Sequence, residues 1–267
     1  MKSASKKWFA IRVSLLLGVL VVAALYAWRD TTGRRERNEW KRTLDVALIV
    51  VRDGPVGDGA LSALRSETRD LEAALARQFA RYRGNSVRPF SFVWYGPAAL
   101  RERIPKPPED GLVAAAKYTW RLRSFTADID SQADVPSRGF DARIYLVVRP
   151  PSARGFVEGM SEDGGRIGVA EAELDETTVA LTLFVAAHEL FHTLGASDRY
   201  GPDGRTLFPD GLAEPEKSPL FPQRYAELMA RNRPLDAERE VPPESLDELW
   251  VGKKTAAEIG WTTPPSR

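Results

Sequence analysis

The apolar run Leu44–Val51 constrains the fold more than any other segment, because its sequence, LDVALIVV, carries almost no polar residue. A strand of this kind is covered on both faces, which is typical of a parallel sheet flanked by helices. Three further runs have the composition of strands, and they alternate with segments whose apolar residues recur at helical spacing. The strands are predicted at residues 90–95, 140–148 and 166–174, and the helices at 61–84, 112–128, 177–194 and 245–260.

This order predicts an α/β fold with a mostly parallel sheet. The alternating run Arg166–Leu174 predicts a strand at an edge of that sheet. Residues 201–223 hold five prolines and therefore predict a long loop, either ordered or mobile, rather than a regular element.

The N-terminal segment predicts a membrane anchor. Residues 13–28 carry no charge, and with residues 9–12 they reach the roughly 20 residues that a membrane-spanning helix needs. A basic tail at residues 1–7 precedes the anchor at 8–28, and Trp8, Tyr26 and Trp28 lie where an aromatic belt is expected. A cleaved signal peptide is the alternative. Residues 29–42 are polar and charged, as in a linker, and residues 43–263 form the predicted catalytic domain.

Composition excludes several kinds of site. The chain has no cysteine, so disulfides, thiolate zinc sites, cysteine nucleophiles and iron–sulfur clusters are ruled out. Lys plus Arg is 38 and Asp plus Glu is 37, a balance that argues against a nucleic-acid partner. Only two histidines are present, His188 and His192, so any histidine chemistry must use that pair.

These histidines enclose the motif His188-Glu189-Leu190-Phe191-His192 in the predicted helix 177–194. Residues four apart lie about 40° apart around a helix, so both imidazoles can reach one cation. Glu189 sits beside the first ligand, where it can take a proton from a water that zinc has acidified. The alternative of two structural histidines is disfavoured, because two buried imidazoles would repel on protonation. The apolar stripe of the helix is complete without them, in Val179, Leu183, Ala187, Leu190 and Leu194.

An open catalytic zinc site needs a third protein ligand. Gly195 can take the left-handed conformation that ends a helix, and the chain can then return and bring Asp198 to the same metal. Glu214 and Glu216 are the alternative third ligands. Arg199 is expected at the solvated surface.

The stretch from His188 to Tyr200 resembles the metzincin zinc peptidases, whose motif runs from the helix through a glycine to a third ligand. Most metzincins have histidine at that position. The snapalysin-like members have aspartate, then one residue and a tyrosine, as in Asp198-Arg199-Tyr200. Met229 lies downstream, where the resemblance implies a methionine turn under the metal.

The resemblance also implies a metzincin-like fold, with a twisted sheet, two backing helices and the active-site helix. Its edge strand, assigned to residues 166–174, would pair with extended substrate. Tyr200 and Tyr225 are candidates for a hydrogen-bond donor in the transition state or for an extra ligand. The loop at 201–223 would shape the substrate cleft or cover it.

The predicted protein is therefore a membrane-anchored zinc endopeptidase that acts on a protein or peptide, with Glu189 as general base and His188, His192 and Asp198 as zinc ligands. Cobalt, nickel or non-haem iron would also fit two histidines and a carboxylate. The alternatives are a catalytically silent zinc-binding module at the membrane and a hydrolase of a non-peptide amide. The C-terminal flank of the anchor carries more basic residues than the N-terminal flank, which by itself places the domain in the cytoplasm, yet the motif favours a periplasmic or extracellular domain. No oligomeric state is predicted.

Overall fold

The computed structural model describes residues 31–84, 87–108, 111–152, 157–161 and 165–262, with a few single positions between residues 8 and 21. The predicted anchor at 8–28 and the tail at 1–7 lie almost entirely outside the described residues. Within the part of the chain that is described, no helix combines the length and the apolar character needed to cross a bilayer.

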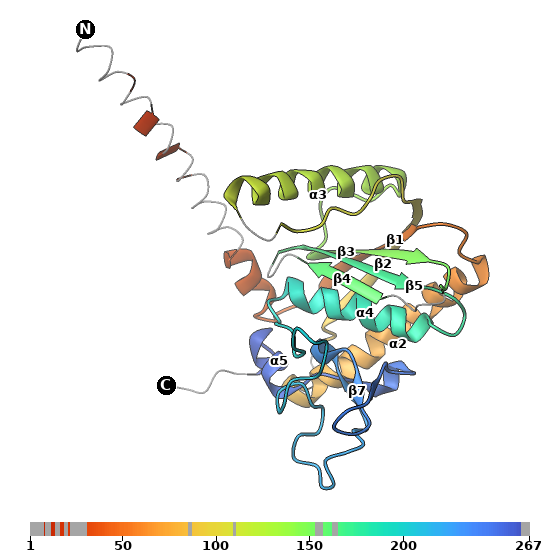
Figure 1. The fold of residues 1–267 in the computed structure, drawn as a ribbon. Helices are drawn as coiled ribbons and strands as arrows, with labels where there is room; N and C mark the ends of the chain where they lie inside the picture. Colours follow the sequence, from red (N-terminus) through yellow and green to blue (C-terminus); the bar gives the residue numbers. More distant parts are fainter. Residues whose placement is uncertain are drawn as a thin grey trace.

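A five-stranded sheet forms the centre of the molecule (Figure 1). Its strands lie in the order β2-β1-β3-β5-β4; the first four run parallel and β4 runs antiparallel to β5. This confirms the predicted α/β fold with a mostly parallel sheet. The strands are β1 (Leu44–Arg52), β2 (Phe90–Ala99), β3 (Ala142–Arg149), β4 (Val157–Ser161) and β5 (Ile167–Glu173).

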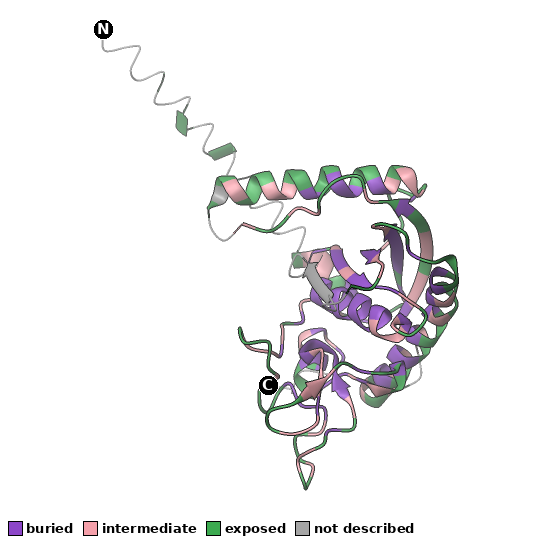
Figure 2. Ribbon diagram, turned by 45° about the vertical axis from the view of Figure 1, so that its right-hand side comes forward, coloured by how far each residue is buried: buried purple, intermediate pink, exposed green. Residues whose placement is uncertain are grey.

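Helices cover both faces of the sheet, which explains why β1 is apolar and buried from Val46 to Val51. Helices α2 (Asp58–Arg83) and α4 (Val179–Thr193) pack on one face. Helix α3 (Leu112–Gln132) packs on the other. Figure 2 shows α4 buried along its length, whereas α3 has an exposed outer face. The active-site helix predicted at 177–194 therefore lies in the interior.

The edge strand is not where the sequence predicts it. Strand β5 lies between β3 and β4, so β4 forms that edge of the sheet. The alternation along β5 reflects two different packing partners rather than solvent. Val169 packs with the α3 layer, whereas Ala170 packs with the α4 layer. Small residues on the α4 side let the helix come close: a Cβ added to Gly168 would lie 3.2 Å from the Glu189 carbonyl oxygen.

The last part of the chain contains short elements, and only Lys253–Glu258 of the helix predicted at 245–260 is α-helical. The backbone N–H of Val251 donates to Gln78 and that of Gly252 donates to Glu227, so distant side chains hold the segment extended. Tertiary contacts thus override the helical pattern. The elements are β6 (Ala226–Glu227), the 3-10 helix Leu228–Ala230, β7 (Arg233–Pro234), β8 (Glu240–Val241), the 3-10 helix Leu246–Glu248, β9 (Leu249–Trp250) and α5 (Lys253–Glu258).

Part of the segment predicted as a linker, residues 29–42, is folded onto the domain. Residues 31–37 are helical, and Trp40 is 4% exposed in the core. The Trp40 indole contacts Phe79 and Trp261 edge-on or tilted, and its Nε1 donates to the Ile259 carbonyl at 2.7 Å. A single aromatic residue in a charged sequence gives no compositional signal of burial, so the sequence did not predict that this segment packs on the domain.

The proline-rich segment 201–223 is an ordered loop. Leu212 and Ala213 are buried, and Gln223 is 1% exposed. The Gln223 side chain donates to the carbonyls of Glu214 and Leu220 and accepts from the Glu214 backbone N–H. These bonds tie together the second half of the segment, residues 214–223, and favour the ordered loop for that half.

Candidate metal centre

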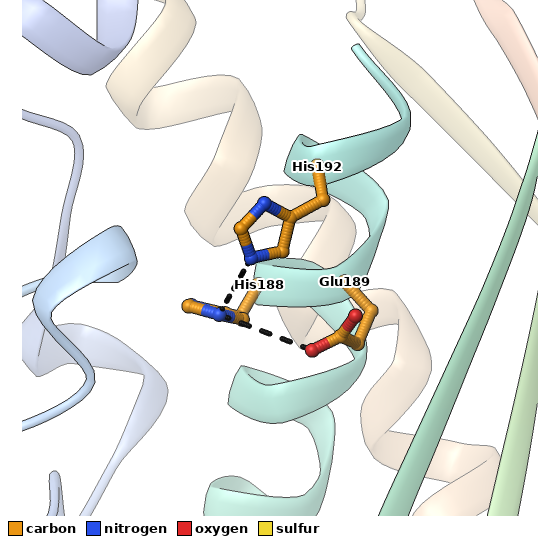
Figure 3. Close-up of side chains that lie close together, drawn as sticks. All are labelled: His188, Glu189 and His192. Carbon is orange, nitrogen blue, oxygen red and sulfur yellow. Dashed lines mark hydrogen bonds and ion pairs between the residues drawn. The ribbon is translucent and has the colours of Figure 1, made fainter. Parts of the chain in front are cut away.

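Helix α4 places the two histidines and Glu189 in a buried cluster (Figure 3). His188, Glu189 and His192 are 4%, 2% and 8% exposed. The Nε2 atoms of the histidines lie 3.1 Å apart, and Glu189 Oε1 lies 3.9 Å from His188 Nε2. The one-turn spacing of the motif thus directs both imidazoles to one point, as the sequence predicts.

Asp198 joins this cluster from the turn after the helix. Its Oδ1 lies 3.1 Å from His192 Nε2 and 3.3 Å from His188 Nε2. The three atoms form a nearly equilateral triangle. A tetrahedral zinc ion with bonds of about 2.0–2.1 Å separates its ligand atoms by about 3.3 Å, so the triangle has the dimensions of a zinc site.

Backbone carbonyls fix the orientation of both imidazoles. His188 Nδ1 lies 2.9 Å from the Leu228 carbonyl oxygen, and His192 Nδ1 lies 2.9 Å from that of Ala196. Because a carbonyl only accepts hydrogen bonds, each Nδ1 carries the proton and each neutral Nε2 presents a lone pair. Two lone pairs at 3.1 Å repel unless a cation or a proton lies between them. The donor set therefore fits a zinc ion.

Without a metal, the same atoms form an ion pair. Burial disfavours the charged form of Asp198, but hydrogen bonds from His188 and His192 outweigh this and lower its pKa below the usual range. Burial also disfavours the His192 imidazolium, yet the carboxylates of Asp198 and Glu189 raise the pKa of His192. A proton and a metal ion thus compete for this cluster.

The turn between His192 and Asp198 has the predicted form. Gly195 has φ +96°, the left-handed conformation that favours glycine. The backbone N–H of Ala196 donates to the Phe191 carbonyl at 3.1 Å, and the Ala196 carbonyl receives His192 Nδ1. This turn therefore ends the helix, brings Asp198 back to the histidines and orients the His192 imidazole.

The segment predicted as a methionine turn contacts His188 through a backbone carbonyl. Met229 is fully buried in the 3-10 helix Leu228–Ala230, next to the carbonyl that holds His188. Its own carbonyl accepts from the Arg199 backbone N–H at 2.9 Å. This segment therefore connects the first histidine to the chain that follows the third predicted ligand.

Glu227 holds the 3-10 helix Leu228–Ala230, a role that the sequence did not predict. Its fully buried carboxylate accepts from the backbone N–H groups of Met229, Ala230 and Gly252 and from the Thr255 hydroxyl, at 2.7–3.1 Å. Burial raises the pKa of Glu227, although these hydrogen bonds oppose the shift. The available signal was a lone acidic residue in the apolar sequence around Met229.

The two candidate tyrosines have different surroundings. The Tyr200 ring stacks on His188, with centroids 6.3 Å apart, and burial and Asp198 raise the pKa of its hydroxyl. The Tyr225 ring stacks on Trp250 at 4.8 Å instead. Tyr200 is therefore the tyrosine that the structure brings to the predicted ligands.

Arg199 was expected at the surface, but it is 5% exposed and pairs with Glu258 at 2.5 Å. The alternative ligands lie elsewhere. Glu214 accepts from the Arg224 backbone N–H, and it lines a cavity together with Glu216 and Trp250. Neither glutamate belongs to the described cluster around His188.

Comparison with known proteins gives little further information. No protein-family model matches the chain, and no curated protein matches it. Among solved structures, the archaemetzincin of Methanopyrus kandleri matches with a TM-score of 0.33 and 17% identity, over 62% of this chain and 80% of that one. Membership of the metzincins therefore remains a prediction that rests on the motif.

Proposed function

We propose that this protein is a zinc-dependent endopeptidase in which His188, His192 and Asp198 hold the metal and Glu189 is the general base. The observation that carries the proposal is the convergence of Nε2, Nε2 and Oδ1 within 3.1–3.3 Å of one another. Both imidazoles are held in the tautomer that binds a metal. A purely structural zinc site would need no carboxylate such as that of Glu189 beside it.

Zinc bound to this donor set would supply a Lewis acid and lower the pKa of a coordinated water towards ~7. Glu189 is held on the helix beside His188, 2% exposed, where it can accept a proton from the attacking water. The same carboxylate then gives that proton to the leaving amine. Tyr200, beside His188, is the candidate donor to the oxygen of the scissile carbonyl.

The proposal includes attachment to a membrane through residues 8–28 and a domain on the periplasmic or extracellular side. Its support is the uncharged run at 13–28 with aromatic residues at both ends. Protease treatment of intact cells and of spheroplasts tests this placement, because an extracellular domain is digested in both, a periplasmic one in spheroplasts, and a cytoplasmic one in neither.

The proposed activity is tested with the purified full chain. Zinc content is measured first, and cleavage of a broad peptide library is then followed by mass spectrometry with and without a chelator. About one zinc per chain and chelator-sensitive cleavage are expected. A folded chain that binds no zinc would refute the proposal. A zinc-loaded chain that cleaves no peptide would favour the silent zinc-binding module.

A further inference from the structure

The segment that follows the predicted anchor packs against the C-terminal end of helix α4 (Figure 1). Arg37 is 3% exposed, and its Nη2 donates to the carbonyls of Thr193 at 3.0 Å and Gly165 at 2.9 Å. The Asn38 side chain donates to the Leu194 carbonyl at 2.9 Å. We call residues 34–40 the strap.

The position of these bonds matters because the last carbonyls of a helix have no partner within the helix. A cation at that end also interacts favourably with the helix dipole. Thr193 and Leu194 directly follow His192 and lead through Gly195 to Asp198. The strap therefore holds the backbone that connects two of the three proposed ligands.

Two further contacts fix the strap itself. A Cβ added to Gly195 would lie 3.3 Å from Arg34 Nη1 and 3.4 Å from Arg34 Cδ, so the Arg34 side chain lies directly over the turn. At the other end, Trp40 is buried and its Nε1 donates to the Ile259 carbonyl. One end of the strap is thus anchored in the core while the other covers the turn.

We infer that the strap is a positioning element of the metal centre, with Arg37 and Asn38 as its positioning residues. The side chain of Asp198 is 40% exposed, against 5% and 10% for His188 and His192. Asp198 is therefore the ligand least held by its surroundings and most dependent on the turn. This inference rests on the proposed zinc site but needs no peptidase activity.

The test measures zinc affinity of the full chain by competition with a chromogenic chelator. The variants are Arg37→Ala, Arg37→Lys and Asn38→Ala. Arg143→Ala is the matched control, because Arg143 is also largely buried and bonds to Asp130 and the Pro136 carbonyl on the α3 side of the sheet. The visible absorption of the cobalt-substituted protein reports the coordination geometry, which a loss of stability alone would not alter. Circular dichroism of each metal-free variant checks the fold.

Loss of a residue that supports a ligand typically weakens metal binding by about 10–100-fold. We expect this for Arg37→Ala, together with a changed cobalt spectrum, and a smaller effect for Asn38→Ala. Arg37→Lys should recover part of the affinity, since an ammonium group can reach one of the two carbonyls. Arg143→Ala should lose stability but keep the parental affinity and spectrum.

Parental zinc affinity and cobalt spectrum in a folded Arg37→Ala variant would overturn the inference, as would an equal loss of affinity in Arg143→Ala. If Arg37→Ala fails to fold, the inference is tested with Asn38→Ala and Arg37→Lys. Parental zinc affinity in both of these variants would overturn it. A parent chain that binds no zinc would overturn the proposed function and this inference with it. A zinc-binding parent with unaffected strap variants overturns the strap alone.

Discussion

The contact between β5 and α4 allows a perturbation that moves the proposed general base without touching a ligand. In Gly168→Ala, the new Cβ would lie 2.9 Å from Ile144 Cδ1 and 3.2 Å from both the Cβ and the carbonyl oxygen of Glu189. Carbon atoms pack at about 3.5–4.0 Å, so the helix must retreat by about 0.3–0.8 Å at Glu189. The side chain of Ile144 must turn as well.

The substitution should lower both the free energy of unfolding and kcat/KM. Overpacking a buried site of this kind costs about 1–3 kcal/mol of the free energy of unfolding. A 1 Å misplacement of a catalytic group costs about 100-fold in rate, so a shift of about 0.3–0.8 Å corresponds to about four- to fortyfold in kcat/KM. Zinc content should stay at the parental level, because all three proposed ligands remain.

The assay combines urea denaturation, zinc content and peptide cleavage by the full chain. Gly57→Ala is the control, because Gly57 has φ −65° and a Cβ added there meets nothing within 4 Å. Because Gly57 is the N-cap of α2, that variant should lose up to about 1 kcal/mol of stability, with parental zinc content and cleavage. Parental stability and activity in Gly168→Ala would show that α4 is not held this close to β5, and the positioning argument for Glu189 would fail.

Three further predictions concern single carboxylates. Glu189→Gln should keep about one zinc per chain and lose peptide cleavage by orders of magnitude; full cleavage would exclude Glu189 as the base. Asp198→Ala should lose most of its zinc, and unchanged zinc content would exclude Asp198 as the third ligand. Because burial raises the pKa of Glu227, the stability it contributes is lost as pH rises through that pKa. Metal-free Glu227→Gln should therefore lose less stability than the parent over that range in urea denaturation, and parallel curves would contradict this.

Much of the fold follows from local patterns. The apolar runs predict four of the five strands, and helical spacing predicts α2, α3 and α4. Strand β4 was missed because Val157–Ser161 is short and includes a glycine. The edge was misassigned because alternation in β5 was attributed to solvent, whereas two helical layers produce it.

The proposed ligands were predictable for a different reason. His188, Glu189 and His192 share one helix, and Asp198 follows through one turn, so helix geometry nearly determines their arrangement. The groups that support them come from far away in the sequence. Arg37 reaches Thr193 across 156 residues, and no local pattern encodes such a contact.

Because a proton and zinc compete for this cluster, the stabilisation that zinc gives should depend on pH. The raised pKa of His192 means that its ion pair stabilises the metal-free protein at low pH, and that this contribution is lost as pH rises through the folded-state pKa. The lowered pKa of Asp198 has the opposite effect: its contribution is present above its unfolded pKa and is lost as pH falls through the folded value. The metal-free cluster is therefore most stable at pH values between the pKa of Asp198 and that of His192.

Zinc binds only the deprotonated donors, so its affinity should rise with pH until His192 has lost its proton in the metal-free form. The increase in Tm on adding zinc, measured against a chelator-treated sample, should grow with pH over this range and then level off. Taking the difference cancels the titration of Glu227, which is common to both samples. Asp210→Asn is a suitable control, since Asp210 pairs with Lys254 and touches no proposed ligand. A zinc-induced increase that is constant with pH, or larger in acid, would mean that the metal does not displace a proton from this cluster.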